Sequence, residues 1–333
     1  MSARPKEGGD RPLELVTMGR VGVDIYPQQV GVGLEDVETF GKFLGGSATN
    51  VAVAAARLGR HSAVVTRTGD DPFGRYVHRA LRGFGVDDRY VSAVDDLPTP
   101  VTFCEIFPPD DFPIYFYRRP TAPDLQITAE SLDLDAIRAA GVFWVTVTGL
   151  SEEPSREATL AALEARAGRG TTVIDLDYRP MFWRSPAEAA EQIRRALPYV
   201  TVAVGNSEEC EVAVGEREPD VAASALRAAG VDTAIVKQGP AGVLGVDAGG
   251  SVVVPPVPVD VVNGLGAGDA FGGALCHGML SGWPLGRTLA FANAAGAYVA
   301  GQLACADAMP TVEQVLAMLP AGQAIGDGEE ALR

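Results

Sequence analysis

Apolar residues follow two spacings along this chain, and the two spacings alternate. Short apolar runs predict strands at 13–18, 61–67, 141–148, 171–176, 200–204 and 233–236. Apolar positions at helical spacing predict helices at 51–58, 73–84, 153–169, 186–196, 220–229, 269–280, 284–301 and 311–319. Strand and helix in repeated order, without an internal sequence repeat, indicate one α/β domain built on a mainly parallel sheet. Such sheets bind ligands beyond the carboxyl ends of their strands.

Residues 99–119 depart from this order. Apolar and aromatic side chains alternate or cluster on both sides of Pro108-Pro109-Asp110-Asp111, which predicts a β-hairpin without a crossover helix. A hairpin of this kind can cover an active site or pair with an edge of another subunit. Arg118 and Arg119, at its end, are candidates for binding an anionic group. Ordinary solvated surface arginines are the alternative.

Composition limits the partners of the protein. With 333 residues, of which 47% are hydrophobic, the chain can bury a sizeable core. Its net charge of −16 repels phosphate backbones and anionic membranes, so we expect neither nucleic acid nor a membrane as a partner. No apolar run is long enough to span a bilayer. An anionic substrate would need a local group of arginines or lysines.

Cysteine and histidine spacing argues against zinc and against a disulfide scaffold. The four cysteines are widely separated without a C-x-x-C pair, and the three histidines lack the spacing of zinc motifs. A reducing cytoplasm is therefore the expected compartment. Residues 1–12 are polar and lack an apolar signal core. We expect a disordered tail there, one folded domain over 13–320 and a flexible tail at 321–333.

Polar side chains stand at three points where predicted strands end or helices begin. Asp24 follows the first strand, Asn50 lies in a first helical turn after two glycines, and Asn206 and Glu209 lie three apart at another helix start. Each can reach a ligand at the edge of the sheet. Each also has an ordinary role open to it, as a turn residue, a helix cap and a capping box respectively.

The segment 264–271, Gly-Leu-Gly-Ala-Gly-Asp-Ala-Phe, has the form of a loop that enters a helix. Glycine allows close approach of a ligand, and the first N–H groups of a helix have no partners within it. Together with the helix dipole they make an anion site, with Asp269 at its rim. A tight turn with Asp269 as an ordinary N-cap is the alternative.

Phosphoryl transfer needs donors around the phosphates, Mg²⁺ and an acceptor for the proton of the attacking hydroxyl. Asn206 and Glu209 can hold hydrated Mg²⁺ through its water molecules. The chain has no G-x-x-x-x-G-K-[ST] motif, and no G-x-G-x-x-G with an acid at the right distance follows the first strand. P-loop enzymes and Rossmann dehydrogenases are therefore poorly supported.

Over about residues 13–319 the chain resembles the ribokinase-like carbohydrate kinases, the PfkB family. Segment 45–50 (Gly-Gly-Ser-Ala-Thr-Asn) is similar to the N-terminal sugar-binding signature, 206–209 (Asn-Ser-Glu-Glu) to the Asn-x-x-Glu motif and 266–269 (Gly-Ala-Gly-Asp) to the C-terminal signature. The resemblance implies a three-layer α/β fold with a mainly parallel central sheet and a small β-sheet lid, from about 22–40 and 99–119. Because this lid forms the dimer contact in many members, we expect a homodimer.

The resemblance also implies roles for individual residues. Asp269 would deprotonate a sugar hydroxyl, and ATP with Mg²⁺ would supply the phosphoryl group. The other implied positions are Gly266, Ala267 and Gly268 for the transferring phosphoryl; Asp24, Gly45, Gly46 and Asn50 for the substrate; Asn206, Lys237, Gly239, Gly242 and Asn293 for ATP; and Asn206 and Glu209 for magnesium.

The residues just before the last signature depart from its common form. Most members have Asp-Thr-Thr where this chain has Asn263-Gly264-Leu265. The usual acid and threonine hydroxyl are missing, which puts in doubt any monovalent-cation site that would use them.

Three segments look most like the inositol-catabolic branch, the 5-dehydro-2-deoxygluconokinases that make the 6-phosphate: 19–26, 34–37 and 116–118. Residues 175–183 are similar to the D-x-N-x-R-x-x-x-W segment of sugar-acid kinases, with Asp177 in place of Asn. A carboxylate substrate needs guanidinium partners, and Arg20, Arg118 and Arg179 are the candidates. Pairing of these arginines with nearby aspartates is the alternative.

Three hypotheses follow from the sequence. The first is an ATP-dependent kinase that phosphorylates a primary hydroxyl of 5-dehydro-2-deoxygluconate. The second is a kinase of the same fold for 2-keto-3-deoxygluconate, fructose or a nucleoside. The third is a non-catalytic sugar- or nucleotide-binding protein. Asp269, together with the Asn206 and Glu209 pair, counts against the third, because binding alone needs no base.

Overall fold

The computed structural model describes residues 12–319, and a nine-stranded sheet forms the centre of this part. The strand order is β13-β12-β11-β10-β9-β8-β1-β4-β5. In chain order these strands are β1 Leu15–Met18, β4 Ser62–Gly69, β5 Val91–Val94, β8 Val142–Thr146, β9 Thr171–Asp175, β10 Val202–Asn206, β11 Thr233–Lys237, β12 Val243–Asp247 and β13 Gly250–Val254. Neighbours are parallel except for β11, β12 and β13, which pair antiparallel at one edge. The predicted tails lie, apart from Pro12, outside the described residues.

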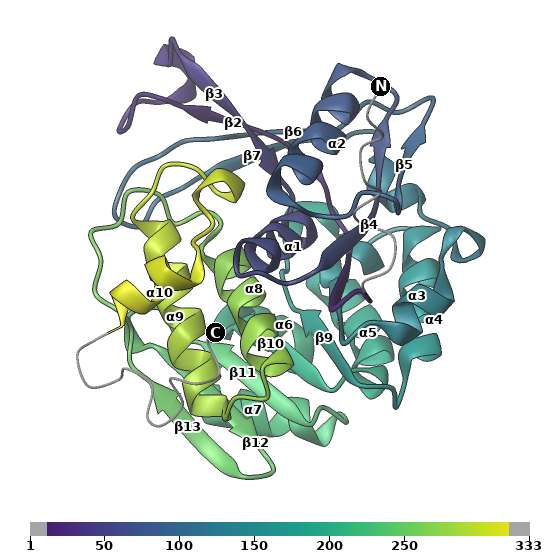
Figure 1. Cartoon of the computed structure of the whole chain (residues 1–333), viewed down its shortest axis with the longest axis vertical. Helices are drawn as coiled ribbons and strands as arrows, with labels where there is room; N and C mark the ends of the chain where they lie inside the picture. Colours follow the sequence, from purple (N-terminus) through teal and green to yellow (C-terminus); the bar gives the residue numbers. More distant parts are fainter. Residues whose placement is uncertain (1–11, 320–333) are drawn as a thin grey trace, which may run out of the picture.

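Helices cover both faces of the sheet and give the three layers visible in Figure 1. One face packs against α1 Ser47–Arg57, α2 Pro72–Phe84, α8 Ala267–Leu280, α9 Leu285–Ala300 and α10 Val312–Met318. The other packs against α3 Leu134–Ala139, α4 Ser155–Arg166, α5 Pro186–Ala196, α6 Ser207–Val214 and α7 Pro219–Ala228. The sequence pattern does not predict α3 or β5, because segments this short show no clear period. No helix in residues 12–319 combines the length and the apolar character needed to cross a membrane.

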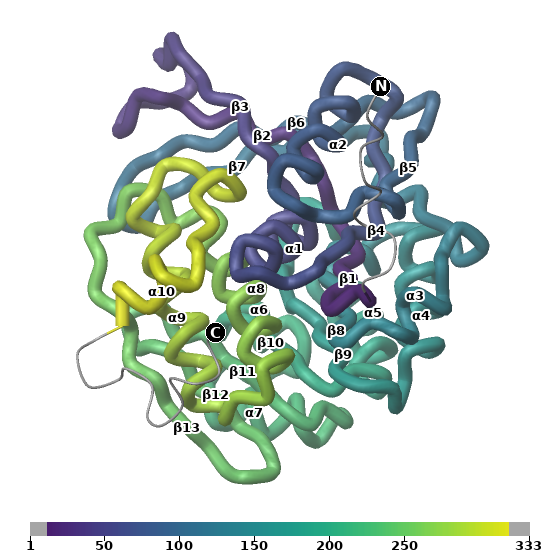
Figure 2. Tube along the Cα trace, viewed as in Figure 1, coloured from purple at the N-terminus to yellow at the C-terminus, as the bar shows by residue number. Residues whose placement is uncertain are grey.

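A smaller sheet projects from one end of the main body (Figure 1). Its order is β3-β2-β6-β7, with β3 at Phe40–Gly45, β2 at Gly22–Pro27, β6 at Val101–Cys104 and β7 at Ile114–Tyr117. The predicted hairpin is the antiparallel β6–β7 pair, and β6 joins β2 in parallel. Figure 2 follows these two distant chain segments to the same end of the molecule. The first segment reaches to Gly45, five residues past the predicted bound.

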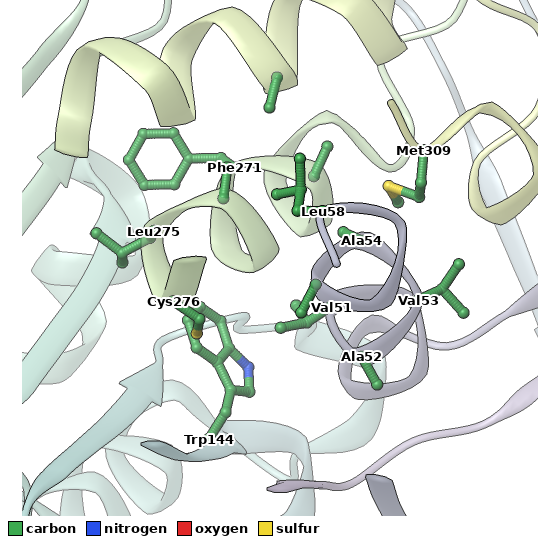
Figure 3. Close-up of a cluster of buried hydrophobic side chains, with 14 of the residues drawn as sticks. Val51, Ala52, Val53, Ala54, Leu58, Trp144, Phe271, Leu275, Cys276 and Met309 are labelled. Carbon is green, nitrogen blue, oxygen red and sulfur yellow. The ribbon is translucent and has the colours of Figure 1, made fainter. Parts of the chain in front are cut away.

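Two glycines allow α8 to pack closely on its neighbours. A Cβ at Gly272 would lie 2.7 Å from the Trp144 ring, and a Cβ at Gly273 would overlap the side chain of Ala54 on α1. Figure 3 shows the apolar side chains of α1 and α8 gathered above Trp144. This packing holds the first turns of α1 and α8 together. The helix predicted to begin at Val51 begins one turn earlier, at Ser47, so that Asn50 lies in its first turn.

Candidate active site

A cleft of about 560 Å³ lies where the smaller sheet, β3-β2-β6-β7, meets the first turns of α1 and α8. This smaller sheet is called the lid sheet from here on. Residues of both sheets, of the first turns of α1 and α8 and of the loops beside them line it. They are Arg20, Asp24, Tyr26, Gly46, Ser47, Asn50, Thr102, Asp110, Phe112, Ile114, Phe116, Arg179, Asn206, Gly264, Leu265, Gly266, Gly268, Asp269 and Cys305. Most of the sequence-predicted substrate, phosphoryl and base residues therefore meet in one place; the four that do not line the cleft are Gly45, Arg118, Asp177 and Ala267.

The first turn of α8 has the form of an open anion site. Gly266 is its N-cap, with φ of +83°, and no side chain caps the helix. Asp269 lies at the third helical position, so it is not the N-cap that the alternative interpretation required. A Cβ at Gly268 would lie 3.6 Å from Nζ of Lys237, which brings an ammonium group to the same helix end. Unpaired N–H groups, the helix dipole and this ammonium group all favour a bound anion.

Asn50 holds the carboxylate of Asp269. Its Nδ2 donates a hydrogen bond of 2.8 Å to Asp269 Oδ2, across 219 residues of sequence. The other amide atom, Asn50 Oδ1, is buried and has no hydrogen-bond partner among the described residues. Asn50 itself lines the cleft. Burial raises the pKa of Asp269 to about 6, against the hydrogen bond from Asn50, which lowers it. A carboxyl with this pKa can accept a proton near neutral pH.

Asp24 lies on the lid strand β2 and faces the cleft. Burial raises its pKa to about 6, and a 2.9 Å hydrogen bond from the Tyr26 hydroxyl opposes that shift. The glycine pair before α1 makes room for it: a Cβ at Gly45 would overlap the Asp24 carboxylate. Gly46 has φ of +104°, and a Cβ there would overlap the carbonyl of Arg20. Both glycines are therefore required by close approach of the backbone and of Asp24.

Arg20 and Arg179 share one carboxylate at the cleft. Arg20 Nη2 lies 3.2 Å from Asp177 Oδ2, and Arg179 Nη2 lies 2.8 Å from Asp177 Oδ1. Ser47 Oγ donates to Asp177 Oδ2 at 2.8 Å. Burial opposes ionisation of Asp177, but the two guanidinium groups outweigh it and lower the pKa of Asp177. Asp177 holds the arginines at the cleft without lining it.

Arg118 lies in a closed pair outside this cleft. Its two terminal nitrogens donate to the two carboxylate oxygens of Asp124 at 3.2 Å and 2.8 Å. It lines a neighbouring cavity of about 810 Å³, with Phe182 and Arg156 among its walls. Pairing with aspartate, the alternative considered for all three arginines, is thus present for each of them.

Asn206 and Glu209 form the capping box that was their ordinary alternative. Glu209 N donates to Asn206 Oδ1 at 2.8 Å, and Asn206 N donates to Glu209 Oε2 at 2.7 Å. Asn206 also lines the cleft. Burial disfavours the charge of Lys237, but Glu209 and Asp175 outweigh it and raise its pKa. Asp175, at the end of β9, has a pKa raised to about 8, mainly by burial.

The remaining predicted ATP residues lie beyond Lys237. Gly242 has φ of +92°, and a Cβ there would overlap the carbonyl of Val254. Asn293 Nδ2 donates to the carbonyls of Val254 at 3.5 Å and Pro255 at 3.1 Å. Gly239, with φ of +55°, begins the short turn between Lys237 and Gly242. Gly242 and Asn293 therefore meet at the carbonyl of Val254, close to the turn that follows Lys237.

The loop before α8 is organised by Asn263, which is fully buried. Its Nδ2 donates to the carbonyl of Leu303 at 2.8 Å, and its Oδ1 accepts from Leu265 N at 3.0 Å. An amide can make both bonds, whereas an aspartate could make only the second. The departure from the family signature therefore has a structural role.

Sequence reasoning missed several residues of the cleft. Tyr26 and Thr102 lie on lid strands, and Phe112 at the tip of the lid hairpin lies against Gly264. Cys305 packs against Gly266 from a loop near the C-terminal end of the domain. Strand alternation from Asp24 could have predicted Tyr26. Nothing in the sequence pattern indicates Cys305.

Comparison with known proteins identifies the family. The model of the pfkB family of carbohydrate kinases matches residues 13–312. The chain belongs to this family. The protein is therefore an ATP-dependent carbohydrate kinase, as predicted from the sequence.

Relatives and solved structures agree with this assignment. The 5-dehydro-2-deoxygluconokinase of Geobacillus kaustophilus is 32% identical over 314 residues, which cover 92% of this PfkB-family kinase and 93% of that protein. The 5-dehydro-2-deoxygluconokinase of Photobacterium profundum is 34% identical, and the match covers 91% of this chain and 94% of that protein. A putative ribokinase II from E. coli, solved with ATP and Mg²⁺, has a TM-score of 0.83 at 23% identity. The match covers 92% of this chain and 98% of that one. The ribokinase-like fold prediction is confirmed.

Proposed function

We propose that this PfkB-family kinase transfers the γ-phosphoryl group of ATP to the 6-hydroxyl of 5-dehydro-2-deoxygluconate. The names of the relatives support this substrate. The observation that carries the chemistry is the Asn50–Asp269 hydrogen bond beside the uncapped first turn of α8. In the proposal this turn binds the transferring phosphoryl group, and Asp269 beside it has a pKa raised to about 6.

In this proposal Asp269 accepts the proton of the attacking hydroxyl while Asn50 holds the carboxylate in place. The transferring group carries its charge on oxygens that amide donors can stabilise, and the N–H groups of residues 266–268, at the uncapped start of α8, would supply these donors. Lys237 adds a positive charge at the same helix end. Asp24 and Asn50 bind substrate hydroxyls.

The carboxylate of the substrate is bound by arginine. Arg20 and Arg179 line the cleft, and the Nε atom of each is buried without a partner among residues 12–319. Two guanidinium groups with one aspartate leave one positive charge for an acid. Arg118, the third sequence candidate, would reach the substrate only if its pair with Asp124 opened.

The residues present fit a hydrated magnesium ion that arrives with the nucleotide. The described residues contain no group of three or more His, Cys, Asp or Glu side chains that could cage a metal. Asn206 and Glu209 would hold such an ion through water, and the ion would neutralise phosphate charge. We expect no requirement for a monovalent cation, because Asn263 and Leu265 supply neither the carboxylate nor the threonine hydroxyl of the common signature.

The lid would close the cleft with one face and dimerise through the other. Its cleft face carries Asp24, Thr102 and Phe116. Its other face is aromatic: Tyr115 and Tyr117 are 45% and 66% exposed, and Phe103 makes edge contacts to Phe40 and Tyr117. Light scattering should show a dimer that Tyr117→Lys weakens; a wild-type monomer would remove this part of the proposal.

An ATP-consumption screen tests the function. The panel is 5-dehydro-2-deoxygluconate, 2-keto-3-deoxygluconate, fructose, ribose and adenosine. The proposal expects the first to have the highest kcat/KM, and preference for another acceptor would select the second hypothesis. No turnover with any acceptor would favour a non-catalytic binding protein.

Asp269→Asn tests the base. We expect kcat to fall about 10³-fold while calorimetric binding of ATP and acceptor stays within threefold. Near-native turnover in this variant would exclude Asp269 as the base.

A further inference from the structure

A small apolar cluster joins the lid to the phosphoryl site. Its fully packed members are Tyr26, Cys104, Ile106 and Cys305. Tyr26 comes from lid strand β2 and Cys305 from the loop before α10, and both are almost fully buried, at 3% and 2% exposed. Phe43, Phe112, Leu265 and Leu303 pack around them.

A chain of hydrogen bonds runs through this cluster. The Tyr26 hydroxyl lies 2.9 Å from Asp24 Oδ2 and 2.9 Å from Cys305 Sγ. A phenol has one proton, and an ionised carboxylate can only accept, so the phenol donates to Asp24. The thiol must then donate to the phenol oxygen. Burial raises the pKa of the Cys305 thiol well above its usual value, which keeps it in the protonated, donating form.

Cys305, at the far end of this series of hydrogen bonds, contacts the first turn of α8. A Cβ at Gly266 would lie 2.7 Å from Cys305 Sγ, so the thiol packs directly on the N-cap of α8. Asp24, Tyr26, Cys305 and Gly266 all line the cleft. The sugar-binding carboxylate and the phosphoryl-binding turn therefore share one buried connection through two side chains.

We propose that Tyr26 and Cys305 are positioning residues: Tyr26 directs the Asp24 carboxylate at the acceptor sugar, and Cys305 ties that carboxylate to the turn that binds the phosphoryl group. The inference rests on the proposed function in two respects: that Asp24 binds an acceptor hydroxyl, and that the first turn of α8 binds the phosphoryl group. Tyr26 does not touch the reacting atoms and acts through Asp24.

Tyr26→Phe tests the first link. The phenyl ring keeps the packing and removes the hydroxyl. We expect the KM for the acceptor to rise about tenfold at pH 7.5, with the KM for ATP and kcat changed less than twofold. Tyr90→Phe is the matched control, because Tyr90 also contacts an aspartate, Asp133 at 3.5 Å, and does not line the cleft.

The pH profile separates positioning from general loss of structure. The hydrogen bond from Tyr26 lowers the pKa of Asp24, so its removal should move the acid limb of kcat/KM for the acceptor from near pH 6 to higher pH. The other groups that act on the charge of Asp24 or are acted on by it are Arg20, Thr102, Tyr76, Cys104 and Cys305. None of these changes in the variant.

Cys305 tests the second link. Cys305→Ser keeps a donor of similar size and should stay within twofold of the wild type, whereas Cys305→Ala should raise the acceptor KM and lower kcat, each about threefold. Equal losses in the two variants, or an unchanged acceptor KM and acid limb in Tyr26→Phe, would overturn the inference. Failure of the wild type to phosphorylate any acceptor would instead overturn the proposed function. Melting temperatures within about 3 °C of the wild type show that each variant has folded.

Discussion

Two arginine–aspartate clusters lie against the ring of Phe182, and they differ in how their charge is used. The guanidinium carbons of Arg118 and Arg20 lie 5.0 Å and 5.9 Å from the centre of this ring. Arg118 is matched one to one with Asp124, both side chains being 5% exposed or less. In the other cluster, Arg20 and Arg179 share the single carboxylate of Asp177.

The two clusters differ in whether an arginine is available to a ligand. In the bidentate pair, both terminal nitrogens of Arg118 already donate to Asp124, and the two charges balance. Opening this pair would leave a buried aspartate unpaired. A shared carboxylate leaves unused donors, such as the Nε atoms of Arg20 and Arg179, and one excess positive charge. We infer that the closed pair stabilises the fold and that the open cluster recognises the acid.

Removing Arg118 should have the largest effect, and the effect should be on stability. Arg118→Met leaves Asp124 buried without a partner, which costs about 3–5 kcal/mol. Chemical denaturation measures this loss. The ratio of kcat/KM for an acid acceptor to that for a neutral one should not change. The double variant Arg118→Met/Asp124→Leu should recover most of the stability, because no charge is then left unpaired. An effect selective for the acid would return Arg118 to the substrate-binding role considered from the sequence.

Removing Arg179 should act on the substrate instead. We expect Arg179→Met to lower kcat/KM for the acid acceptor about 100-fold, the value of a lost charge-assisted hydrogen bond of about 2.7 kcal/mol, and to leave a neutral hexose within threefold. Arg184→Met is the control, since Arg184 pairs with Glu188 and its side chain is 86% exposed. Similar losses for acid and neutral acceptors would mean that Arg179 only positions Asp177.

The sequence predicts which residues lie in the first turns of helices, but it does not predict which aspartate each arginine pairs with. Asn50, Asp269 and the open turn of α8 were predictable, because each lies at a fixed place in the first turn of a helix. The partners of the arginines were not. Asp124 lies in a short turn, at Pro123–Gln126, which has no periodic pattern, and its position decides whether Arg118 is free.

The fold shows the same division. Apart from α3 and β5, the alternation of strands and helices in the main body follows from apolar spacing, and so does the hairpin of the lid. The Tyr26–Cys305 contact joins residues 279 apart in the sequence. Contacts of this kind depend on how the lid sits on the body, and no local pattern encodes that.

Lowering the pH from 7 to 5 should reduce kcat/KM while the charge of Asp177 is retained. Burial raises the pKa of Asp24 and of Asp269 to about 6, so each gains a proton between pH 7 and pH 5. Asp177 stays ionised because Arg179 and Arg20 lower its pKa. We therefore expect kcat/KM to fall at least tenfold over this range, because the proposed base, Asp269, is then protonated. Binding of an unreactive acid such as gluconate should strengthen instead, as the cleft becomes more positive. Weaker gluconate binding at pH 5 would argue against Arg20 and Arg179 as its partners.

The smallest effect should come from Asp177 itself, at the position where sugar-acid kinases carry Asn. Asp177→Asn removes the negative charge between the two guanidinium groups, while Ser47 and the amide oxygen remain as partners for Arg20. The two guanidinium groups should then attract a substrate carboxylate more strongly. They also lose the ion pairs to Asp177 that hold them in position. We expect the KM for the acid acceptor to fall about threefold, because these two effects oppose each other. Asp124→Asn is the matched change in the closed cluster and should leave that KM unchanged. If Asp177→Asn raised the KM as much as Arg179→Met does, Asp177 would act mainly to hold the arginines, and the excess charge of the open cluster would count for little.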